Sequence, residues 1–553
     1  MLFLAGATLL LSHEQTRSTL ENVVTELAPI AADHLFALLA STVALAIMSL
    51  LWARAVSGKA DKAPVKQGAY GAVVTHKHSV WDQISRLDEV WAALKLVAEK
   101  KLAKPKAMPT RLPAELWDHL NKTSRSFAAV IRVLPAPDVA DAVCVFYLVL
   151  RALDTIEDEM DLSKFDEFRK DGETALEAKV RLLIDFHTIF DDKQGCDYPL
   201  ERILKSTIGA AAERALLGSV PMLIAAFREV KQNQVIKEIT MLMGKGMAEY
   251  VVRDMKLGTH DEKDYDQYCH IVAGLVGKGL TDIFCNLGYE DAALTSDFES
   301  WNCMGLLLQK CNITRDVCED AAEGRSWWPQ SIWKSGENPP DQLRDLRDLS
   351  ILNKMVANAL QLVPQATKYL DKLKTPSVFG FCALPQIMAL ATLAACYSNP
   401  DVYTGVVKIR AGQAAYLVLA LRQTTTSAQR KAYKKEAARL VNEIRHKAVA
   451  IGDVETIAGC DRALAALGGQ VEKKLVTTSS GQIALSYTAF LALVYAAKAQ
   501  PLTPAKLLKL VEFATGNDPG LTLAFVIALA SSAGWCVIWA FKSLAAKRGG
   551  GEQ

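Results

Sequence analysis

The chain has 553 residues, of which 50% are apolar and 22% charged, and 63 basic against 61 acidic residues leave a net charge of +2. This composition excludes a disordered or collagen-like protein, and the balanced charge argues against a nucleic-acid-binding chain. Eleven cysteines are scattered without a CxxC pair. This is typical of buried reduced thiols rather than of a disulfide framework or a zinc site.

Residues 35–53 near the N-terminus form an uncharged apolar run. A secretory signal peptide would begin nearer the terminus and have a shorter apolar region, so we expect a membrane-spanning helix after an N-terminal segment, 1–34. The basic residues that follow place the chain from Arg54 onward in the cytosol. Residues 54–111 have a basic excess and are interpreted as a linker near an anionic membrane surface, with a solvated tail as the alternative. One helix is expected within it, at about 81–101.

From residue 112 to residue 450, apolar residues recur at helical spacing in one stretch after another, and strand-like alternation is nearly absent. Prolines and glycines separate the stretches, and no repeat of solenoid length is present. We therefore expect a single large all-α domain. The expected helical stretches are 113–133, 138–161, 202–230, 233–256, 262–287, 297–323, 341–374, 383–397, 404–423 and 427–449.

The C-terminal region contains a second uncharged run, LTLAFVIALASSAGWCVIWAF at 521–541. As a helix it would span about 31 Å, the thickness of the hydrocarbon core of a bilayer. Tryptophans near one end and the basic tail 542–553 are typical of a membrane anchor. The preceding segment, 451–520, is expected to be a linker. Within it, 483–497 is short for a span, so a further membrane crossing and interfacial or core packing both stay open.

Two of the helical stretches end in the same acidic pattern, DxxED. Positions i, i+3 and i+4 share one face of a helix, so each copy gathers three carboxylates on one patch. A single copy would be best interpreted as a solvated helix end. Two copies, each at the end of an apolar helix, favour a site for a cation, and hard oxygen ligands suit Mg²⁺ together with substrate phosphates. The six carboxylates are Asp154, Glu157, Asp158, Asp316, Glu319 and Asp320.

Polar residues extend each acidic patch back along its helix. Tyr147 and Arg151 do so on the first helix, and Gln309 and Asn312 do so on the second. A helix among apolar neighbours places polar residues there only where they line a cavity. We expect a central cavity with carboxylates at its mouth and apolar walls, suited to a diphosphate joined to a hydrocarbon. The arginines available for phosphate oxygens are Arg151, Arg315 and Arg325.

Six ordered segments between residues 112 and 422 resemble the squalene synthases, the farnesyl-diphosphate farnesyltransferases. Phytoene synthases share the two acidic helices but not the flanking segments. The resemblance implies an all-α isoprenoid-synthase fold and two half-reactions. In these, two farnesyl diphosphates form presqualene diphosphate, which NADPH then reduces to squalene. The segments are SRSFAAVI, FYLVLRALDTIED, MGKGMAEY, YCHIVAGLVGKGL, LLQKCNITRDVCED and SVFGFCALPQIMALATLAACY.

The resemblance also implies roles for individual residues. The six carboxylates match Mg²⁺-binding positions. Tyr268 matches an acid/base tyrosine of the first half-reaction, and Phe381 matches an aromatic ring that stabilises a carbocation in the second half-reaction. Further matches are diphosphate contacts at Ser124, Arg125, Arg151, Arg315 and Arg325, and pocket-lining positions at Phe127, Tyr147, Gln309, Asn312, Pro385 and Gln386.

The chain departs from the family pattern in places. Val317 and Cys318 replace larger residues between expected ligands, where no loss of metal binding is expected. The nicotinamide-binding segment KIRKG appears as KIRAG, with Lys408 and Arg410 retained and Ala411 in place of a basic residue. The span at 35–53 is an addition to the usual C-terminal anchor.

Three functions therefore stay open. The leading one is a squalene synthase in the endoplasmic-reticulum membrane, monomeric, with its catalytic domain facing the cytosol. The second is a related enzyme that stops at presqualene diphosphate or makes another C30 product. The third is a membrane-tethered helical scaffold without catalysis, which the intact acidic motifs and Tyr268 disfavour. No GxGxxG follows a strand, so a Rossmann domain is not expected to bind the cofactor.

Overall fold

The computed structural model describes residues 66–68, 71–76, 78–79, 82–83, 86–102, 110–135, 137–191, 197–336 and 338–469. The chain divides into two compact units. The unit considered below comprises 57–79 and 88–475, and the other lies almost entirely outside the described residues. The expected spans at 35–53 and 521–541, the segment 483–497 and the tail 542–553 also lie outside them and stay predictions.

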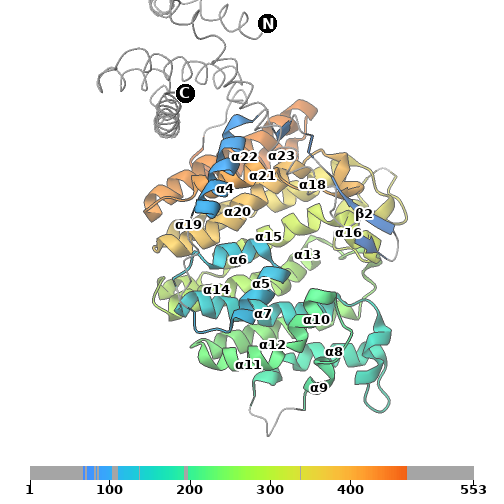
Figure 1. Ribbon diagram of the computed structural model, residues 1–553. Helices are drawn as coiled ribbons and strands as arrows, with labels where there is room; N and C mark the ends of the chain where they lie inside the picture. Colours follow the sequence, from blue (N-terminus) through green and yellow to red (C-terminus); the bar gives the residue numbers. More distant parts are fainter. Residues whose placement is uncertain are drawn as a thin grey trace, which may run out of the picture. The chain divides into compact units, whose positions relative to one another are not determined.

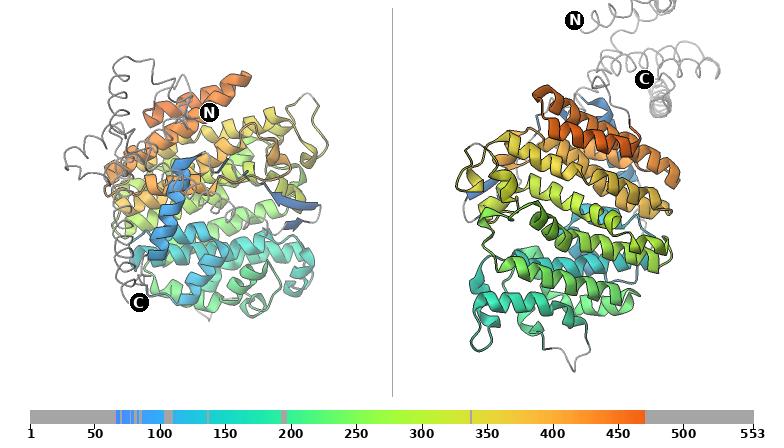
Figure 2. Two further views of the ribbon diagram at one scale, coloured as in Figure 1. Left: turned by 45° about the horizontal axis from the view of Figure 1, so that its top comes forward. Right: turned by 180° about the vertical axis from the view of Figure 1, so that it is seen from behind.

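The compact unit is built from layers of α-helices (Figures 1 and 2). In Figure 1 the helices from α8 onward run roughly in chain order from α8–α12 at the bottom to α22 and α23 at the top, whereas α5–α7 lie above α12 and α4 lies beside α22. The helices are α4 (Leu87–Leu102), α5 (Ala114–Thr123), α6 (Arg125–Ile131), α7 (Asp138–Asp158), α8 (Ala175–Asp185), α9 (Leu200–Ile203), α10 (Ala211–Gly218), α11 (Val220–Glu229), α12 (Asn233–Val251), α13 (Glu262–Cys269), α14 (Leu275–Asn286), α15 (Phe298–Arg315), α16 (Val317–Glu323), α17 (Gln330–Trp333), α18 (Leu349–Leu360), α19 (Val363–Lys372), α20 (Pro376–Cys396), α21 (Ala411–Ala420), α22 (Thr426–Ile451) and α23 (Val454–Leu467).

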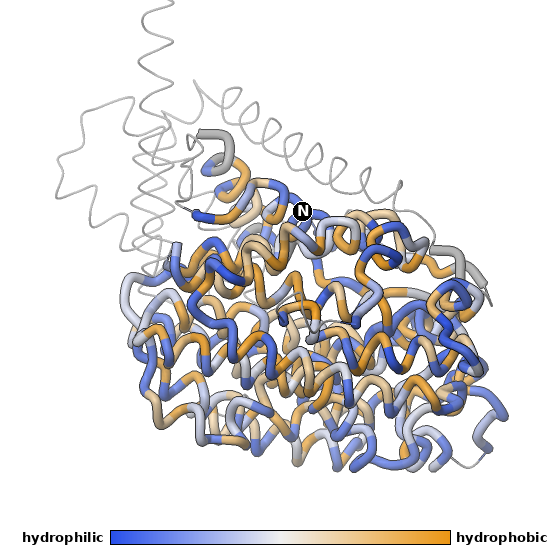
Figure 3. Tube along the Cα trace, turned by 90° about the horizontal axis from the view of Figure 1, so that it is seen from below, coloured by the Kyte–Doolittle hydropathy of each residue, from blue (hydrophilic) through white to orange (hydrophobic). Residues whose placement is uncertain are grey.

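Short turns and three short strands complete the described unit. The strands run in the order β1-β2-β3. Strands β1 and β2 pair in antiparallel fashion, and strands β2 and β3 pair in parallel fashion. Figure 3 shows hydrophobic and hydrophilic residues alternating along the helices, as expected of amphipathic helices that share a core. The shorter elements are the 3₁₀ turns η1 (Leu162–Phe168), η2 (Phe186–Phe190), η3 (Met255–Leu257), η5 (Ala292–Ser296), η6 (Leu343–Asp345) and η7 (Pro400–Tyr403), the π-helical turn η4 (His270–Gly274), and the strands β1 (Lys66–Gly68), β2 (Gly71–Thr75) and β3 (Gly405–Val406).

Helices α15 and α20 lie at the centre of the unit. Helix α15 packs against α14, α18, α19 and α20, so its apolar residues are buried on several faces. Helix α20 is the one described helix that is long and apolar enough to cross a membrane. However, 72% of its apolar window is buried, as expected of a core helix in a large domain.

A close crossing of α14 and η4 with α15 depends on glycine. A Cβ on Gly305 would lie 2.2 Å from the carbonyl oxygen of Ala273, and one on Gly277 would lie 2.5 Å from that of Trp301. Real Cβ atoms do not approach a carbonyl oxygen so closely, so only glycine, which has no side chain, fits at both positions. This crossing fixes the π-helical turn η4 directly after Tyr268, at the end of α13.

The structure differs from the sequence prediction at several element boundaries. The stretch 297–323 is not one helix, because it breaks at Asp316. The stretch 404–423 begins with β3 and becomes helical only at Ala411. The stretches 341–374 and 202–230 each contain separate helices, and the later helix of each has proline in its first turn. Proline suits that position because it lacks the N–H that would otherwise be unpaired.

The segment predicted as a linker, 54–111, holds defined structure in its described part. It contains β1, β2 and α4, and β2 pairs with β3 from far along the chain. The expected helix at 81–101 corresponds to α4. At the other end, the domain expected to stop at 450 continues through α23. Apolar residues on these elements, such as Val90 and Leu464, are buried in the unit.

Candidate active site

The first acidic motif forms the last turn of α7. Lys179 on α8 is buried, and its ammonium donates hydrogen bonds to the carbonyl oxygens of Glu157 at 2.7 Å and Glu159 at 2.8 Å. Carbonyls at the end of a helix have no partner within the helix, so Lys179 fixes this turn. Its positive charge also lies next to Asp158 and offsets part of the acidic cluster.

The second acidic motif lies across the break between α15 and α16. Asp316 stands between the two helices, and its carboxylate accepts two hydrogen bonds from the guanidinium of Arg315, at 2.7 and 2.5 Å. Glu319 and Asp320 fall in the first turn of α16, where the helix dipole favours negative charge. The expectation that this motif closes one continuous helix is therefore wrong. Asp316 leaves the helical backbone angles, with φ of −96° and ψ of 10°, and its side chain binds Arg315 rather than capping α16.

Arg325 connects the two motifs. Gly324 ends α16 in the left-handed conformation, with φ of 85°, and turns the chain so that Arg325 returns to the acidic cluster. The guanidinium lies 2.7 Å from Asp158 of the first motif and 3.4 Å from Asp320 of the second, and 3.0 Å from Glu323. The two motifs thus meet, as the paired pattern predicted.

Arg151 binds the opposite end of the first motif. One nitrogen lies 3.2 Å from Asp154, and another pairs with Glu213 at the start of α10. Together with Arg315 and Arg325, this places all three predicted phosphate-binding arginines on carboxylates. A diphosphate would therefore replace carboxylates as the partner of these arginines.

The carboxylates of the cluster are held in an environment that disfavours their charge. Burial, followed by repulsion from neighbouring carboxylates, raises the pKa of Asp154 to about 7 and of Glu157 to about 8. Burial also raises the pKa of Asp320 to about 7, although Arg325 opposes this. These carboxylates are hard oxygen ligands with too few positive charges nearby, and such a ligand set suits a divalent cation. Among the described residues, however, no three acidic, histidine or cysteine side chains are already arranged around one metal position.

This cluster leads to a prediction for stability. Without divalent cations, the folded protein should become more stable as the pH falls from about 8 to about 6, because the carboxyls with pKa near 7 and 8 take up protons. The same groups in the unfolded chain titrate near pH 4 and stay ionised over this range. Stability is therefore lost as the pH rises through the folded pKa values. Thermal unfolding in EDTA at both pH values tests this.

Two controls accompany that measurement. The double variant Asp154→Asn, Asp320→Asn should show a flatter pH dependence, and saturating Mg²⁺ should flatten it in the unaltered protein. Equal slopes in all three samples would contradict the assignment.

Tyr268 lies next to the cluster within an aromatic stack. Its ring is parallel to that of Trp327, with centroids 3.7 Å apart, and meets the ring of Tyr250 edge-on at 5.0 Å. Burial, then the nearby carboxylate of Glu157, raise the pKa of Tyr268 well above its usual value, and Arg325 opposes the shift. Tyr268 therefore keeps its proton at neutral pH beside the acidic cluster.

The loop after α16 is anchored so that it carries both Arg325 and Trp327. The amide of Ser326 donates to the carbonyl of Met255 at 2.8 Å, and the indole of Trp328 donates to that of Ile313 at 3.1 Å. One loop therefore positions the arginine between the carboxylates and the ring that packs on Tyr268.

Phe381 and two of the predicted pocket-lining residues lie on α20. Phe381 is buried and meets Phe284 of α14 edge-on, with centroids 5.7 Å apart. Gln386 donates to the carbonyl of Met304 at 2.7 Å, whereas its buried side-chain oxygen has no hydrogen-bond partner among the described residues. Pro385 lies inside the same helix and is half-buried.

The remaining predicted pocket residues lie on α6, α7 and α15. Ser124 caps α6 by accepting from the amide of Phe127 at 3.3 Å, and the ring of Phe127 stacks on Tyr147 at 5.5 Å. Gln309 is half-buried on α15, whereas Asn312 is exposed. The side chain of Arg125, the first residue of α6, lies outside the described residues.

The segment KIRAG, predicted to bind the cofactor, forms hydrogen bonds with α4 and with His78 near the start of the described chain. The guanidinium of Arg410 makes two hydrogen bonds to Glu89 of α4, at 2.8 and 2.6 Å. Lys408 is exposed, and its carbonyl oxygen lies 2.5 Å from the ring of His78. Ala411 is exposed at the start of α21. Of the two retained basic residues, Arg410 therefore already has a carboxylate partner.

Sequence reasoning missed four residues that shape this site: Lys179, Glu213, Trp327 and Glu89. Lys179 lies 22 residues from Glu157 and Glu213 lies 62 residues from Arg151, both on helices other than α7, so no spacing rule within one helix connects them to it. Trp327 stands two residues after Arg325, and that proximity was an available signal. Glu89 lay in the segment that was interpreted as a linker.

The fold and the acidic cluster define the class of protein. It is a mostly helical domain of the isoprenoid-synthase type, in which Arg325 joins the two acidic motifs. The chain belongs to the squalene/phytoene synthase family, which matches residues 120–413. Mouse squalene synthase is 43% identical over 309 residues, covering 55% of this chain and 68% of that protein. Human squalene synthase is 41% identical over 333 residues, covering 58% and 73%. A solved structure of TcSQS with a ligand has a TM-score of 0.56 at 35% identity, covering 64% of this chain and 98% of that one.

Proposed function

We propose that this protein joins two farnesyl diphosphates head to head and reduces the resulting presqualene diphosphate with NADPH to squalene. Family membership and the squalene synthase relatives support this substrate and product. Within the structure, the observation that carries the proposal is Arg325, which holds Asp158 and Asp320 together near Tyr268.

The six carboxylates of the paired motifs are proposed to hold Mg²⁺. When bound, the metal would neutralise the leaving diphosphate and so favour cleavage of the allylic C–O bond. Arg151, Arg315 and Arg325 then exchange their present carboxylate partners for diphosphate oxygens, which they can bind in bidentate fashion.

Tyr268 and Phe381 are proposed to act in different half-reactions. In the first, one diphosphate and one proton leave as two C15 units become one C30 diphosphate, and the Tyr268 hydroxyl exchanges a proton beside the departing group. In the second, the remaining diphosphate leaves and NADPH supplies a hydride. The ring of Phe381 stabilises the intervening cation through its negative face.

NADPH binding is proposed at Lys408 and Arg410. Ala411→Lys should lower the KM for NADPH about tenfold if the added contact contributes about 1.4 kcal/mol. The first half-reaction needs no reductant and should not change. Ala411 is exposed at the start of α21, so a lysine fits there without displacing a neighbour. Titrating NADPH against squalene formation at two salt concentrations tests this.

Ala411→Gln is the matched control for that titration, because it adds length without charge. Identical titrations for the lysine variant and the unaltered protein would contradict the contact. A gain confined to low salt would show only long-range attraction.

Product analysis tests the function as a whole. The full chain is incubated with farnesyl diphosphate, with and without Mg²⁺ and NADPH. Squalene with both additives supports the proposal. Presqualene diphosphate as the end product would support the truncated reaction, and no turnover would support the scaffold. We further propose a monomer in the endoplasmic-reticulum membrane whose catalytic domain faces the cytosol, consistent with the apolar segments at 35–53 and 521–541.

A further inference from the structure

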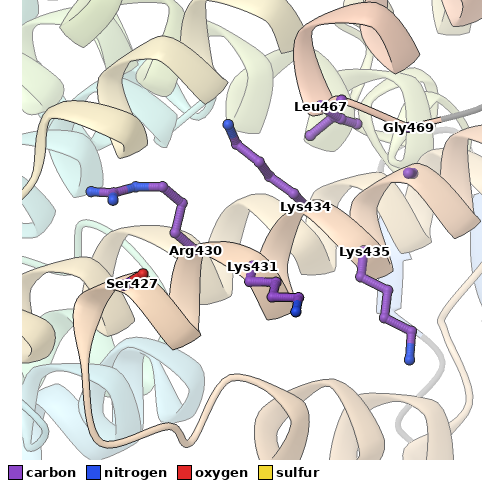
Figure 4. Close-up of a pocket in the computed structure, with 9 residues that line it drawn as sticks. Ser427, Arg430, Lys431, Lys434, Lys435, Leu467 and Gly469 are labelled. Carbon is purple, nitrogen blue, oxygen red and sulfur yellow. The ribbon is translucent and has the colours of Figure 1, made fainter.

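A basic groove lies between α22 and the end of α23, remote from the acidic cluster in sequence and on other helices. Its volume is about 420 Å³, and its lining contains no acidic residue. Figure 4 shows Arg430 and Lys434 leaving α22 on the side where Leu467 lies, whereas Lys431 and Lys435 point away from Leu467 and Gly469. The lining residues are Ser427, Arg430, Lys431, Lys434, Lys435, Ala438, Leu467, Gly468 and Gly469.

The four basic residues form two pairs with different partners. Arg430 and Lys434 are four residues apart and both bind Asp371 of α19, at 3.3 and 2.8 Å. Lys431 and Lys435 are also four residues apart, are exposed, and leave the same side of α22 in Figure 4. Neither forms an ion pair or hydrogen bond with any residue that the structure describes. One pair therefore stiffens the groove, and the other presents unneutralised charge to solvent.

The end of α23 forms the other side of this groove. Gly468 adopts the left-handed conformation, with φ of 65°, and the amide of Gly469 donates to the carbonyl of Leu464 at 2.9 Å. This arrangement turns the chain against α22, where a Cβ on Gly469 would lie 2.8 Å from that of Ala438. The chain leaves the described residues at this point and continues to the apolar run 521–541.

We propose that this groove is a docking surface for anionic phospholipid headgroups of a bilayer, a proposal that rests on the proposed membrane anchor at 521–541. Lys431 and Lys435 provide charge complementarity, because each basic residue near an anionic surface adds to the attraction. The path of the chain identifies the occupant, since the groove is bounded by the residues from which the chain continues toward its anchor. An anchored chain holds the groove near lipid at high effective concentration, so weak contacts suffice to orient the domain.

Lysine footprinting of the full chain in nanodiscs tests the proposal without using catalysis. Reductive methylation, quantified by mass spectrometry, is compared in discs of neutral lipid and in discs rich in phosphatidylserine. Modification of Lys431 and Lys435 should fall about tenfold in the anionic discs and recover at high salt. Lys205, exposed just after α9 at the opposite end of the unit in Figure 1, should not change.

A variant supplies the second measurement. Lys431→Glu with Lys435→Glu should abolish the lipid-dependent protection of backbone amides in α22, measured by hydrogen exchange, whereas Lys122→Glu with Lys205→Glu should retain it. Equal modification in neutral and anionic discs would overturn the proposal. Equal protection by both lipids would overturn it in favour of a protein or apolar contact. Protection by soluble inorganic phosphate in neutral discs would overturn it in favour of a free-anion site.

Discussion

Asp320→Asn should lower squalene formation by about 10²–10³-fold while the protein stays folded. Asparagine keeps the shape of the side chain, and the contact that it weakens is an ion pair, because the Nε of Arg325 lies 3.4 Å from Asp320 and forms no hydrogen bond among the described residues. It loses the negative charge, which is the property that a metal ligand at this position would need. The Mg²⁺ concentration for half-maximal rate should rise, and thermal unfolding should show an intact fold.

Glu323→Gln is the matched control for this experiment. Glu323 also binds Arg325, at 3.0 Å, but stands outside both DxxED patterns. Its loss should therefore change the rate little if Asp320 acts as a metal ligand. Equal losses in the two variants would mean that Asp320 acts only by holding Arg325. Full turnover of the unaltered protein in EDTA would contradict the metal proposal itself.

The paired motifs show how far local spacing predicts a site. The i, i+3, i+4 pattern correctly placed Asp154, Glu157 and Asp158 on the last turn of one helix, and the repeat of the pattern correctly suggested that two helices meet. Spacing did not show that the chain breaks at Asp316, because an aspartate that starts a new helix and one that ends the old helix have the same neighbours. The backbone angles at Asp316, with φ of −96° and ψ of 10°, show the break only in three dimensions.

The fold was predictable in class but not in its boundaries. Apolar periodicity identified an all-α domain, because long buried helices such as α15 and α20 dominate its core. The same signal failed for 66–75, where strands of three and five residues are too short to show alternation, although it did predict the helix that corresponds to α4. Strand β2 pairs with β3, and Glu89 of α4 pairs with Arg410, and no window of the sequence contains these distant partners. Membrane-like hydropathy was also ambiguous, since α20 passes the same test as an anchor and yet is mostly buried.

Charge balance explains why the site needs its distant residues. Arg325 brings carboxylates of the two motifs near one another, and burial already raises the pKa of Asp154, Glu157 and Asp320. Lys179, Arg151 and Arg325 reduce this repulsion in the structure by binding the ends of the motifs. The same arginines are the proposed diphosphate ligands. Substrate and metal would therefore arrive as a neutralising pair, the metal on the carboxylates and the diphosphate on the arginines.

Tyr268→Phe should block formation of presqualene diphosphate, with a loss of about 10²–10⁴-fold if the hydroxyl acts in proton transfer. Phenylalanine keeps the parallel stack on Trp327, whose centroid lies 3.7 Å from that of Tyr268, so packing should change little. Conversion of supplied presqualene diphosphate to squalene should be far less affected. Single-turnover assays of each half-reaction measure the two steps separately.

Phe381→Leu should affect the second half-reaction more than the first, the reverse of Tyr268→Phe. Leucine keeps the buried position filled, whereas alanine would leave a cavity next to Phe284. Loss of the ring should slow the reduction of presqualene diphosphate by about tenfold, the scale of a cation–π contact in a dry pocket.

Tyr250→Phe is the control for loss of a phenol beside Tyr268. Its hydroxyl binds Asp264 at 2.8 Å, so it should lower stability and spare both half-reactions. If the Tyr268 and Phe381 variants lost the same single step, the division of roles would be wrong. If Tyr250→Phe also lost the first step, the effect of Tyr268→Phe would have to be assigned to the aromatic stack rather than to proton transfer.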